Sequence, residues 1–116
     1  LTKALLPALR EGGAAKVGNM SSLMGSIADN RSGGYYAYRA SKTSLNMITM
    51  SMSRDLLNEG IIPVALHPGW VRTDMGGPNG AIDVATSTNG LFTVMEELEA
   101  SGSGSFFQWD GTKLPW

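Results

Sequence analysis

Tyr38 and Lys42 lie four residues apart in the stretch GGYYAYRASKTSLN, which the sequence predicts to begin a helix. At that spacing the two side chains share one helical face. A free tyrosine hydroxyl has a pKa near ~10 and transfers protons poorly at neutral pH, but a nearby ammonium stabilises the phenolate. The two residues are therefore a candidate unit for general acid–base catalysis. Tyr35 and Tyr36 have no lysine four residues later, so we expect them to pack around the helix start.

A second group of polar residues comes before this helix. The stretch NMSSLMG places Ser21 and Ser22 where a strand is predicted to end. In open parallel sheets, ligands bind outside the carboxyl ends of the strands. A serine hydroxyl there could hydrogen-bond a substrate carbonyl, although an ordinary polar strand end would look the same in the sequence.

A third group follows the next predicted strand, in the stretch HPGWVRTDM. Pro68 and Gly69 predict a sharp turn that lets the backbone approach a ligand. Thr73 and Asp74 could cap the following segment or contact a phosphate or amide. His67 is the only histidine, and no G-x-S-x-G sequence surrounds either serine, so we expect it to end its strand rather than serve a Ser-His-Asp triad.

The composition excludes several classes of protein. The chain has 116 residues, 42% of them hydrophobic and 16% charged, with a net charge of −1 and no cysteine. These values are typical of a globular domain, without the basic stripe of a nucleic-acid-binding protein. Disulfides and thiolate metal sites are impossible, and no histidine or carboxylate pair has metal-ligand spacing. No apolar run approaches the ~18 residues of a membrane span, so we expect a cytoplasmic protein without membrane or nucleic-acid partners.

Helix and strand patterns alternate along the chain. The apolar spacing of residues 1–11, followed by two glycines, predicts the end of a helix. Pro63 lies near the start of the second strand, where a proline is tolerated. The predicted order is helix 1–11, strand 14–22, loop 23–34, helix 36–58, strand 61–69, loop 70–80, helix 83–100, and an aromatic strand with an Asp-Gly turn in 104–116. This order predicts an α/β fold with parallel strands and helical crossovers.

Together, the stretches NMSSLMGSI, YAYRASK and HPGWVRTDMGG resemble the short-chain dehydrogenase/reductase family. The likeness is closest to its C-factor and sniffer-like carbonyl reductase branch, and it extends to LTKALLPALR and DGTKLPW at the ends of the chain. It implies the C-terminal half of a Rossmann-like doubly wound parallel sheet, with three strands and three helices. Residues 1–116 would form the C-terminal part of a single domain.

The resemblance also implies roles for three catalytic residues. Tyr38 would be the general acid that protonates the carbonyl oxygen as hydride arrives at carbon. Lys42 would support that tyrosine and hydrogen-bond the nicotinamide ribose, and Ser22 would polarise the carbonyl. The implied function is NAD(P)H-dependent reduction of a small-molecule aldehyde or ketone to an alcohol.

Further residues would contact the cofactor, for which the branch implies NADP, with NADPH favoured over NADH. Pro68 and Gly69 are similar to the turn that frames the nicotinamide ring, with the backbone around Val71 reaching the carboxamide. Thr73 matches a position whose hydroxyl contacts the carboxamide or a phosphate. Trp70 and Met75 would lie near the entrance to the substrate site.

The sequence departs from the family pattern in two places. Tyr38 follows Ser22 by 16 residues, which is longer than usual, and the extra residues fall in the predicted loop ADNRSGG. The glycine-rich G-x-x-x-G-x-G turn that binds dinucleotide phosphates does not occur. We therefore expect the N-terminal cofactor-binding half to be absent, and the 116 residues alone neither to bind dinucleotide tightly nor to turn over.

Two alternatives remain at this stage. The protein could be a secondary-alcohol dehydrogenase of the same family, because the chemistry is reversible. It could also be a non-catalytic fragment that acts only in association. In relatives the Tyr-Lys helix and the helix before it often pack across a two-fold interface, so a homodimer of the full-length protein is implied, with Met47, Met50 and Met52 as an apolar surface.

Overall fold

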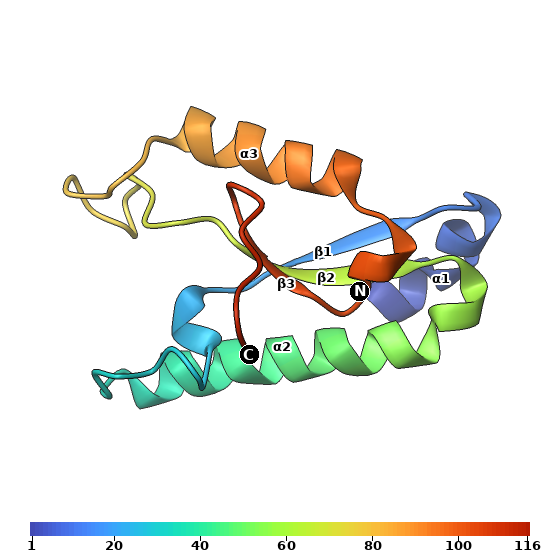
Figure 1. Ribbon diagram of the computed structural model, residues 1–116, viewed down its shortest axis with the longest axis horizontal. Helices are drawn as coiled ribbons and strands as arrows, with labels where there is room; N and C mark the ends of the chain where they lie inside the picture. Colours follow the sequence, from blue (N-terminus) through green and yellow to red (C-terminus); the bar gives the residue numbers. More distant parts are fainter.

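Three parallel strands form one sheet in the computed structural model, which describes residues 1–116 (Figure 1). The strands lie in the order β1 (Lys16–Met20), β2 (Ile62–His67) and β3 (Phe106–Gln108). Helices α1 (Thr2–Glu11), α2 (Tyr36–Asp55) and α3 (Val84–Glu97) precede these strands in turn. Both strand pairs are parallel, so the predicted α/β order is confirmed.

The two longer helices cover opposite faces of the sheet (Figure 1). Neighbouring β1 residues demonstrate this: the Asn19 side chain bonds Thr49 on α2, whereas Gly18 lies against Met95 on α3. Both crossovers step the same way across the sheet, from β1 to β2 and from β2 to β3. Because they pass over opposite faces, one of them must be left-handed, against the usual right-handed rule.

The face of the sheet under α3 carries the apolar core. Alternate residues of β2 point to this face, and α3 and the segment after it supply the other side. Full burial of one such side chain stabilises the fold by roughly 1.5–3 kcal/mol. The buried cluster consists of Ile62, Val64, Leu66, Leu91 and Leu98.

The face under α2 combines polar and apolar side chains, since Ala65 and Phe106, in register with Asn19, are fully buried there. The buried residues of α2 are Asn46, Thr49 and Ser53, and Asn19 donates to Thr49 Oγ1 at 2.9 Å. Buried polar groups of this kind need partners, which β1 and the following segment supply for Asn46 and Thr49, whereas Ser53 bonds the Met50 carbonyl of α2 itself. Apolar side chains of α2 face outward, with Met47 66% and Ile48 53% exposed.

Pro63 is the second residue of the central strand, near its start as predicted. The N–H of Ile62 bonds the Ala15 carbonyl on the β1 side, so the Pro63 nitrogen faces the β3 side. Pairing there begins with the Pro63 carbonyl, which accepts the Gly104 N–H at 2.8 Å, and the first donor from β2 is the Ala65 N–H, which bonds Ser105. The missing N–H of the proline therefore costs the sheet no hydrogen bond.

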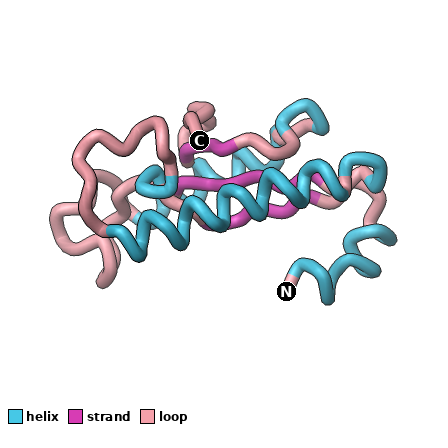
Figure 2. The backbone as a smooth tube through the Cα atoms, turned by 90° about the horizontal axis from the view of Figure 1, so that it is seen from below, coloured by secondary structure: helices cyan, strands magenta, loops and turns pink.

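Helix α1 forms as predicted but lies beyond the end of the sheet where β1 begins, as Figures 1 and 2 show. None of its residues is buried, and Leu5 is 47% exposed. Arg10 Nη2 donates to Glu59 Oε1 at 3.0 Å, which ties this helix to the turn before β2. The leucine face of α1 is thus largely uncovered within these residues.

Several boundaries differ from the sequence prediction. Helix α2 ends at Asp55 instead of residue 58, and a 3₁₀ turn, η2 (Leu57–Glu59), completes the connection. The predicted loop 23–34 begins with another 3₁₀ turn, η1 (Leu23–Gly25), and η3 (Ala100–Gly102) replaces the predicted end of α3. No helix combines the length and the hydropathy of a membrane span.

Candidate active site

The carboxyl ends of β1 and β2 lie side by side. Met20 is in register with Leu66, and the Ser21 N–H donates to the Leu66 carbonyl at 2.7 Å. The loops after both strands, and the first turn of α2, therefore meet at the same end of the sheet (Figure 1). This is the edge at which parallel sheets bind ligands.

Tyr38 and Lys42 lie on the first turns of α2 at this edge. Lys42 Nζ is 5.7 Å from the centroid of the Tyr38 ring and donates to the Met20 carbonyl at 3.1 Å. The Tyr38 side chain is 39% exposed, and its hydroxyl makes no hydrogen bond within the protein. The lysine is therefore held beside the ring, while the phenolic oxygen is free to meet another group.

The other two tyrosines do not pack around the helix start, so that prediction is wrong. Tyr35 is 74% exposed and Tyr36 86% exposed. Tyr36 is two residues before Tyr38 and so points about half a helical turn away from it. Tyr35 adopts the left-handed conformation with φ of 50°, directly after Gly33 and Gly34, which also have positive φ. The chain thus enters α2 through a turn that directs both side chains into solvent.

The two serines after β1 have different partners. Ser21 is buried and its hydroxyl donates to Asn46 Oδ1 at 2.6 Å. Ser22 caps η1, where its oxygen accepts the Met24 N–H at 3.2 Å, and its hydroxyl donates to no protein group. Of the two, only Ser22 has a hydroxyl hydrogen available for a ligand.

The turn after β2 is held by partners on α3 and beyond β3. The Ser87 hydroxyl donates to the Pro68 carbonyl at 2.6 Å. Gly69 has φ of +84°, and a Cβ there would lie 2.9 Å from the Trp109 ring, so only glycine suits this position. Trp70 is 57% exposed and its indole Nε1 donates to the Gly76 carbonyl at 2.7 Å.

Val71 and Thr73 lie on the loop that follows this turn. Val71 pairs with Ile82 in an isolated parallel bridge, and its own N–H donates to no protein group. The Thr73 hydroxyl oxygen accepts the Gly76 N–H at 3.0 Å, which closes a tight turn. Thr73 therefore caps the following segment, one of the two roles that the sequence left open.

His67 ends β2, as predicted. Burial lowers the pKa of His67 below its usual range, and the negative charge of Asp29 offsets part of this effect. Its Nδ1 is buried and has no hydrogen-bond partner, so no carboxylate orients the ring as a triad would require. The structure gathers no group of three metal-ligating side chains.

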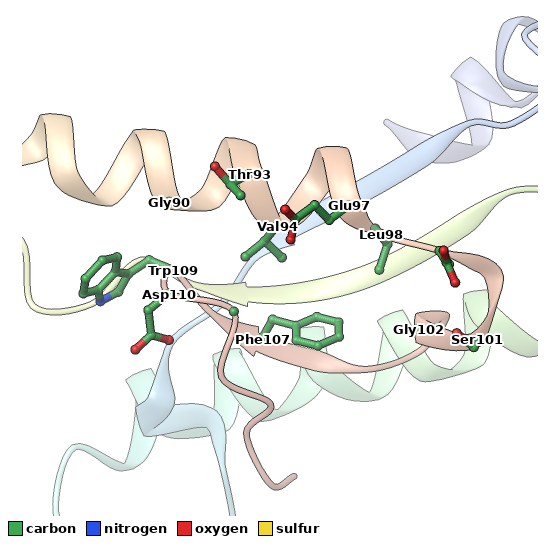
Figure 3. Close-up of a pocket in the computed structure, with 12 residues that line it drawn as sticks. Gly90, Thr93, Val94, Glu97, Leu98, Ser101, Gly102, Phe107, Trp109 and Asp110 are labelled. Atoms are coloured by element: carbon green, nitrogen blue, oxygen red, sulfur yellow. The ribbon is translucent and has the colours of Figure 1, made fainter.

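A cavity of about 440 Å³ lies away from this edge, between α3 and the segment around β3 (Figure 3). Val94, Phe107 and Trp109 line it, with Glu97 and Asp110 at its sides. None of the candidate residues Ser22, Tyr38 and Lys42 contributes to its lining. The cavity is therefore separate from these three residues, although Trp109, which lines it, also packs against Gly69.

Sequence reasoning missed two residues that contact the site. Arg39 donates to the Gly34 carbonyl and to Ser32 Oγ, both at 3.1 Å, and so fastens the long loop to α2. Asn46 is one helical turn after Lys42 and holds Ser21. The repeated spacing of four from Tyr38 through Lys42 to Asn46 was the signal that could have identified it.

Comparison with known proteins identifies the family. Residues 1–83 match the short chain dehydrogenase family. The chain is 49% identical over 116 residues to C-signal of Myxococcus xanthus and covers 70% of that protein. Among solved structures, the carbonyl reductase Sniffer of D. melanogaster is similar with a TM-score of 0.94 and 44% identity, over 100% of this chain and 51% of that one.

A second solved structure, the NADPH-bound carbonyl reductase from chicken fatty liver, has a TM-score of 0.91 and 38% identity. The chain again matches over its full length, 100%, and covers 51% of that protein. It thus spans about half the length of both reductases. The predicted family and the Rossmann-like α/β fold are confirmed, and the chain belongs to the short-chain dehydrogenase/reductase family of oxidoreductases.

Proposed function

We propose that this chain carries the proton-transfer residues of an NADP-dependent reductase that converts an aldehyde or ketone to an alcohol. The observation that carries the proposal is the free Tyr38 hydroxyl beside the fixed Lys42 ammonium, at the carboxyl edge of the sheet. Ser22, with an unused hydroxyl hydrogen, follows the neighbouring strand. The two similar carbonyl reductases, one of them solved with NADPH, support the same assignment.

Each side chain has one task in the proposed reaction. The Ser22 hydroxyl donates a hydrogen bond to the substrate carbonyl oxygen and so polarises the carbon. When bound, NADPH supplies the hydride that this carbon accepts. The Tyr38 hydroxyl gives its proton to the carbonyl oxygen, which completes the alcohol. The Lys42 ammonium stabilises the negative charge left on the tyrosine oxygen.

The residues present fit the nicotinamide end of such a cofactor. The Val71 N–H has no acceptor in the protein and is available for a carboxamide oxygen. Pro68 and Gly69 form a turn that Ser87 and Trp109 hold in place. Lys42 would hydrogen-bond the ribose and Thr73 the carboxamide or a phosphate.

The phosphate-binding turn of the cofactor site is not among these residues. No G-x-x-x-G-x-G occurs in the sequence, and the chain spans about half of the two reductases. We propose that residues 1–116 act as the C-terminal part of a single Rossmann domain in a cytoplasmic protein. The open edge of β1, which pairs only with β2, is where further strands of that domain would add.

We also propose that the full-length protein is a homodimer through the outer face of α2. The apolar side chains of Met47 and Ile48 are 66% and 53% exposed there, whereas Met50 and Met52 are half-buried. Met47 and Ile48 would therefore form the centre of the contact. A sedimentation mass equal to one chain at micromolar concentration would contradict this proposal.

The test of function uses the full-length protein that carries residues 1–116. A panel of aldehydes, ketones, quinones and secondary alcohols is assayed with NADPH, NADH and their oxidised forms, followed by nicotinamide absorbance. We expect carbonyl reduction with NADPH. Oxidation of alcohols with no measurable reduction would favour the dehydrogenase alternative, and no turnover with any pair would contradict the proposal.

A further inference from the structure

A buried hydrogen-bond network joins the segment after β1 to the helix that carries Tyr38 and Lys42. The Ser21 hydroxyl donates to Asn46 Oδ1 at 2.6 Å, and Asn46 Nδ2 donates to the Gly25 carbonyl at 3.2 Å. The Thr43 hydroxyl donates to the same carbonyl at 2.9 Å. The Asn46 side chain therefore forms hydrogen bonds to the segment on both sides of Ser22.

The geometry leaves little freedom at this contact. Ser21 and Asn46 are each 3% exposed, and a Cβ on Gly25 would lie 2.8 Å from Lys42 Cβ. The segment thus packs directly on the backbone of α2 at Lys42. Because the segment is already packed this closely, the main effect of the Ser21–Asn46 hydrogen bond is to fix the position of the segment on α2.

The single turn of η1 lies between Ser21 and Gly25, the two residues that Asn46 holds. The Gly25 N–H donates to the Ser22 carbonyl at 2.8 Å, and the Met24 N–H donates to Ser22 Oγ at 3.2 Å. The orientation of the Ser22 hydroxyl therefore depends on where Gly25 and Ser21 are held. Loss of Asn46 would remove the Ser21 anchor and one of the two side-chain hydrogen bonds to the Gly25 carbonyl, while leaving Ser22 itself unchanged.

We infer that Asn46 is a positioning residue that sets the Ser22 hydroxyl relative to Tyr38. This inference rests on the proposed function, because it acts through the serine that would polarise the substrate carbonyl. A misplacement of about 1 Å at a reacting group lowers rates by roughly 10²-fold. Asn46 touches no reacting atom, so its effect should appear in kcat and not in cofactor binding.

The test compares Asn46→Ala with Thr49→Val, a matched variant on the same buried face of α2. Thr49 bonds Asn19 on β1 and has no hydrogen bond to residues 21–25. In the full-length protein, Asn46→Ala is expected to lower kcat about 10- to 100-fold with the KM for NADPH unchanged. Thr49→Val is expected to retain the wild-type kcat.

A double-variant cycle separates positioning from general destabilisation. If Asn46 acts through Ser22, adding Asn46→Ala to Ser22→Ala causes no further loss of kcat. Two independent effects would multiply instead, and that result would overturn the inference.

Hydrogen exchange provides a readout that does not depend on activity. The amides of Gly25 and Ser26, which bond the Ser22 and Leu23 carbonyls, should exchange faster in Asn46→Ala and at the wild-type rate in Thr49→Val. Unchanged exchange in Asn46→Ala would overturn the inference even if kcat fell. If Tyr38→Phe keeps full activity, the proposed function fails. The hydrogen exchange of the Gly25 and Ser26 amides would then decide by itself whether Asn46 holds this segment.

Discussion

Lys42 holds its ammonium 5.7 Å from the centroid of the Tyr38 ring and is itself fixed by a 3.1 Å hydrogen bond to the end of β1. The lysine therefore links the helix to the strand whose end carries Ser22. A lysine side chain without such a partner would sample many rotamers, because fixing them costs conformational entropy, and its ammonium would not stay beside the tyrosine. The contact with Met20 removes that freedom and keeps the charge at the tyrosine.

Replacing Lys42 should slow the reaction without unfolding the protein. In Lys42→Met the long apolar stem is kept, but the charge that we propose to stabilise the tyrosine oxygen is lost. We expect kcat of the full-length protein to fall by about 10²-fold or more at neutral pH, in the range of acid–base effects. Lys3→Met, which removes an exposed charge from α1, is the control and should leave kcat unchanged. Equal activity of the two variants would contradict the role given to Lys42.

A methyl group at Gly25 should destabilise the fold. A Cβ there would lie 2.8 Å from Lys42 Cβ and 2.9 Å from the Lys42 backbone carbon, so α2 and η1 would have to separate. Overpacking of this kind costs about 1–3 kcal/mol, which urea unfolding of Gly25→Ala would measure.

Gly12→Ala is the matched control for this change. Gly12 has a helical φ of −72°, and its Cβ would meet only ordinary contacts at 3.7 and 3.8 Å. We expect its unfolding free energy to change by less than about 0.5 kcal/mol. A midpoint for Gly25→Ala that matches Gly12→Ala would show that the predicted steric conflict is relieved without cost.

The single histidine should make stability depend on pH just below neutrality. Burial lowers the pKa of His67 in the folded protein, whereas the unfolded chain has the ordinary value of about 6.5. The unfolded state therefore binds more protons in this window. The stabilising contribution is complete above pH ~6.5 and is lost as pH falls through the folded pKa.

Urea unfolding near pH 7.5 and pH 5.5 measures this effect against His67→Gln, which cannot titrate. We expect the wild type to lose stability over that interval and the variant to lose less. Asp83 and Asp110 contribute little there, because the backbone N–H of Thr86 lowers the pKa of Asp83 and that of Thr112 lowers the pKa of Asp110. An identical loss in both proteins would refute the assignment to His67.

The sequence was sufficient to predict the element order and the edge of the sheet where the three groups of candidate residues lie. Alternating apolar periods and glycine stops are local signals, and the spacing of Tyr38 and Lys42 is fixed by the helix itself. The place of Ser22 and Pro68 at one edge followed from parallel pairing, since the carboxyl ends of parallel strands meet there. These features depend on short stretches of chain.

Features that depend on distant contacts could not be predicted. The spacing of four places Asn46 on the helical face of Lys42, but its burial could not be predicted, because it depends on partners supplied by Ser21 and Gly25. The outward direction of Tyr36 depends on which face of α2 meets the sheet. The opposite placement of α2 and α3 also contradicts the handedness rule, so topology rules alone would have put both helices on one face.

The most direct test of the account compares Tyr38→Phe with Tyr36→Phe in the full-length protein. Both remove one hydroxyl from the first turn of α2, but the Tyr36 side chain is 86% exposed and points away from Lys42. We predict that Tyr38→Phe lowers kcat for carbonyl reduction by about 10²- to 10⁴-fold, while Tyr36→Phe keeps the wild-type rate. Wild-type turnover by Tyr38→Phe would contradict the proposal that this hydroxyl supplies the proton.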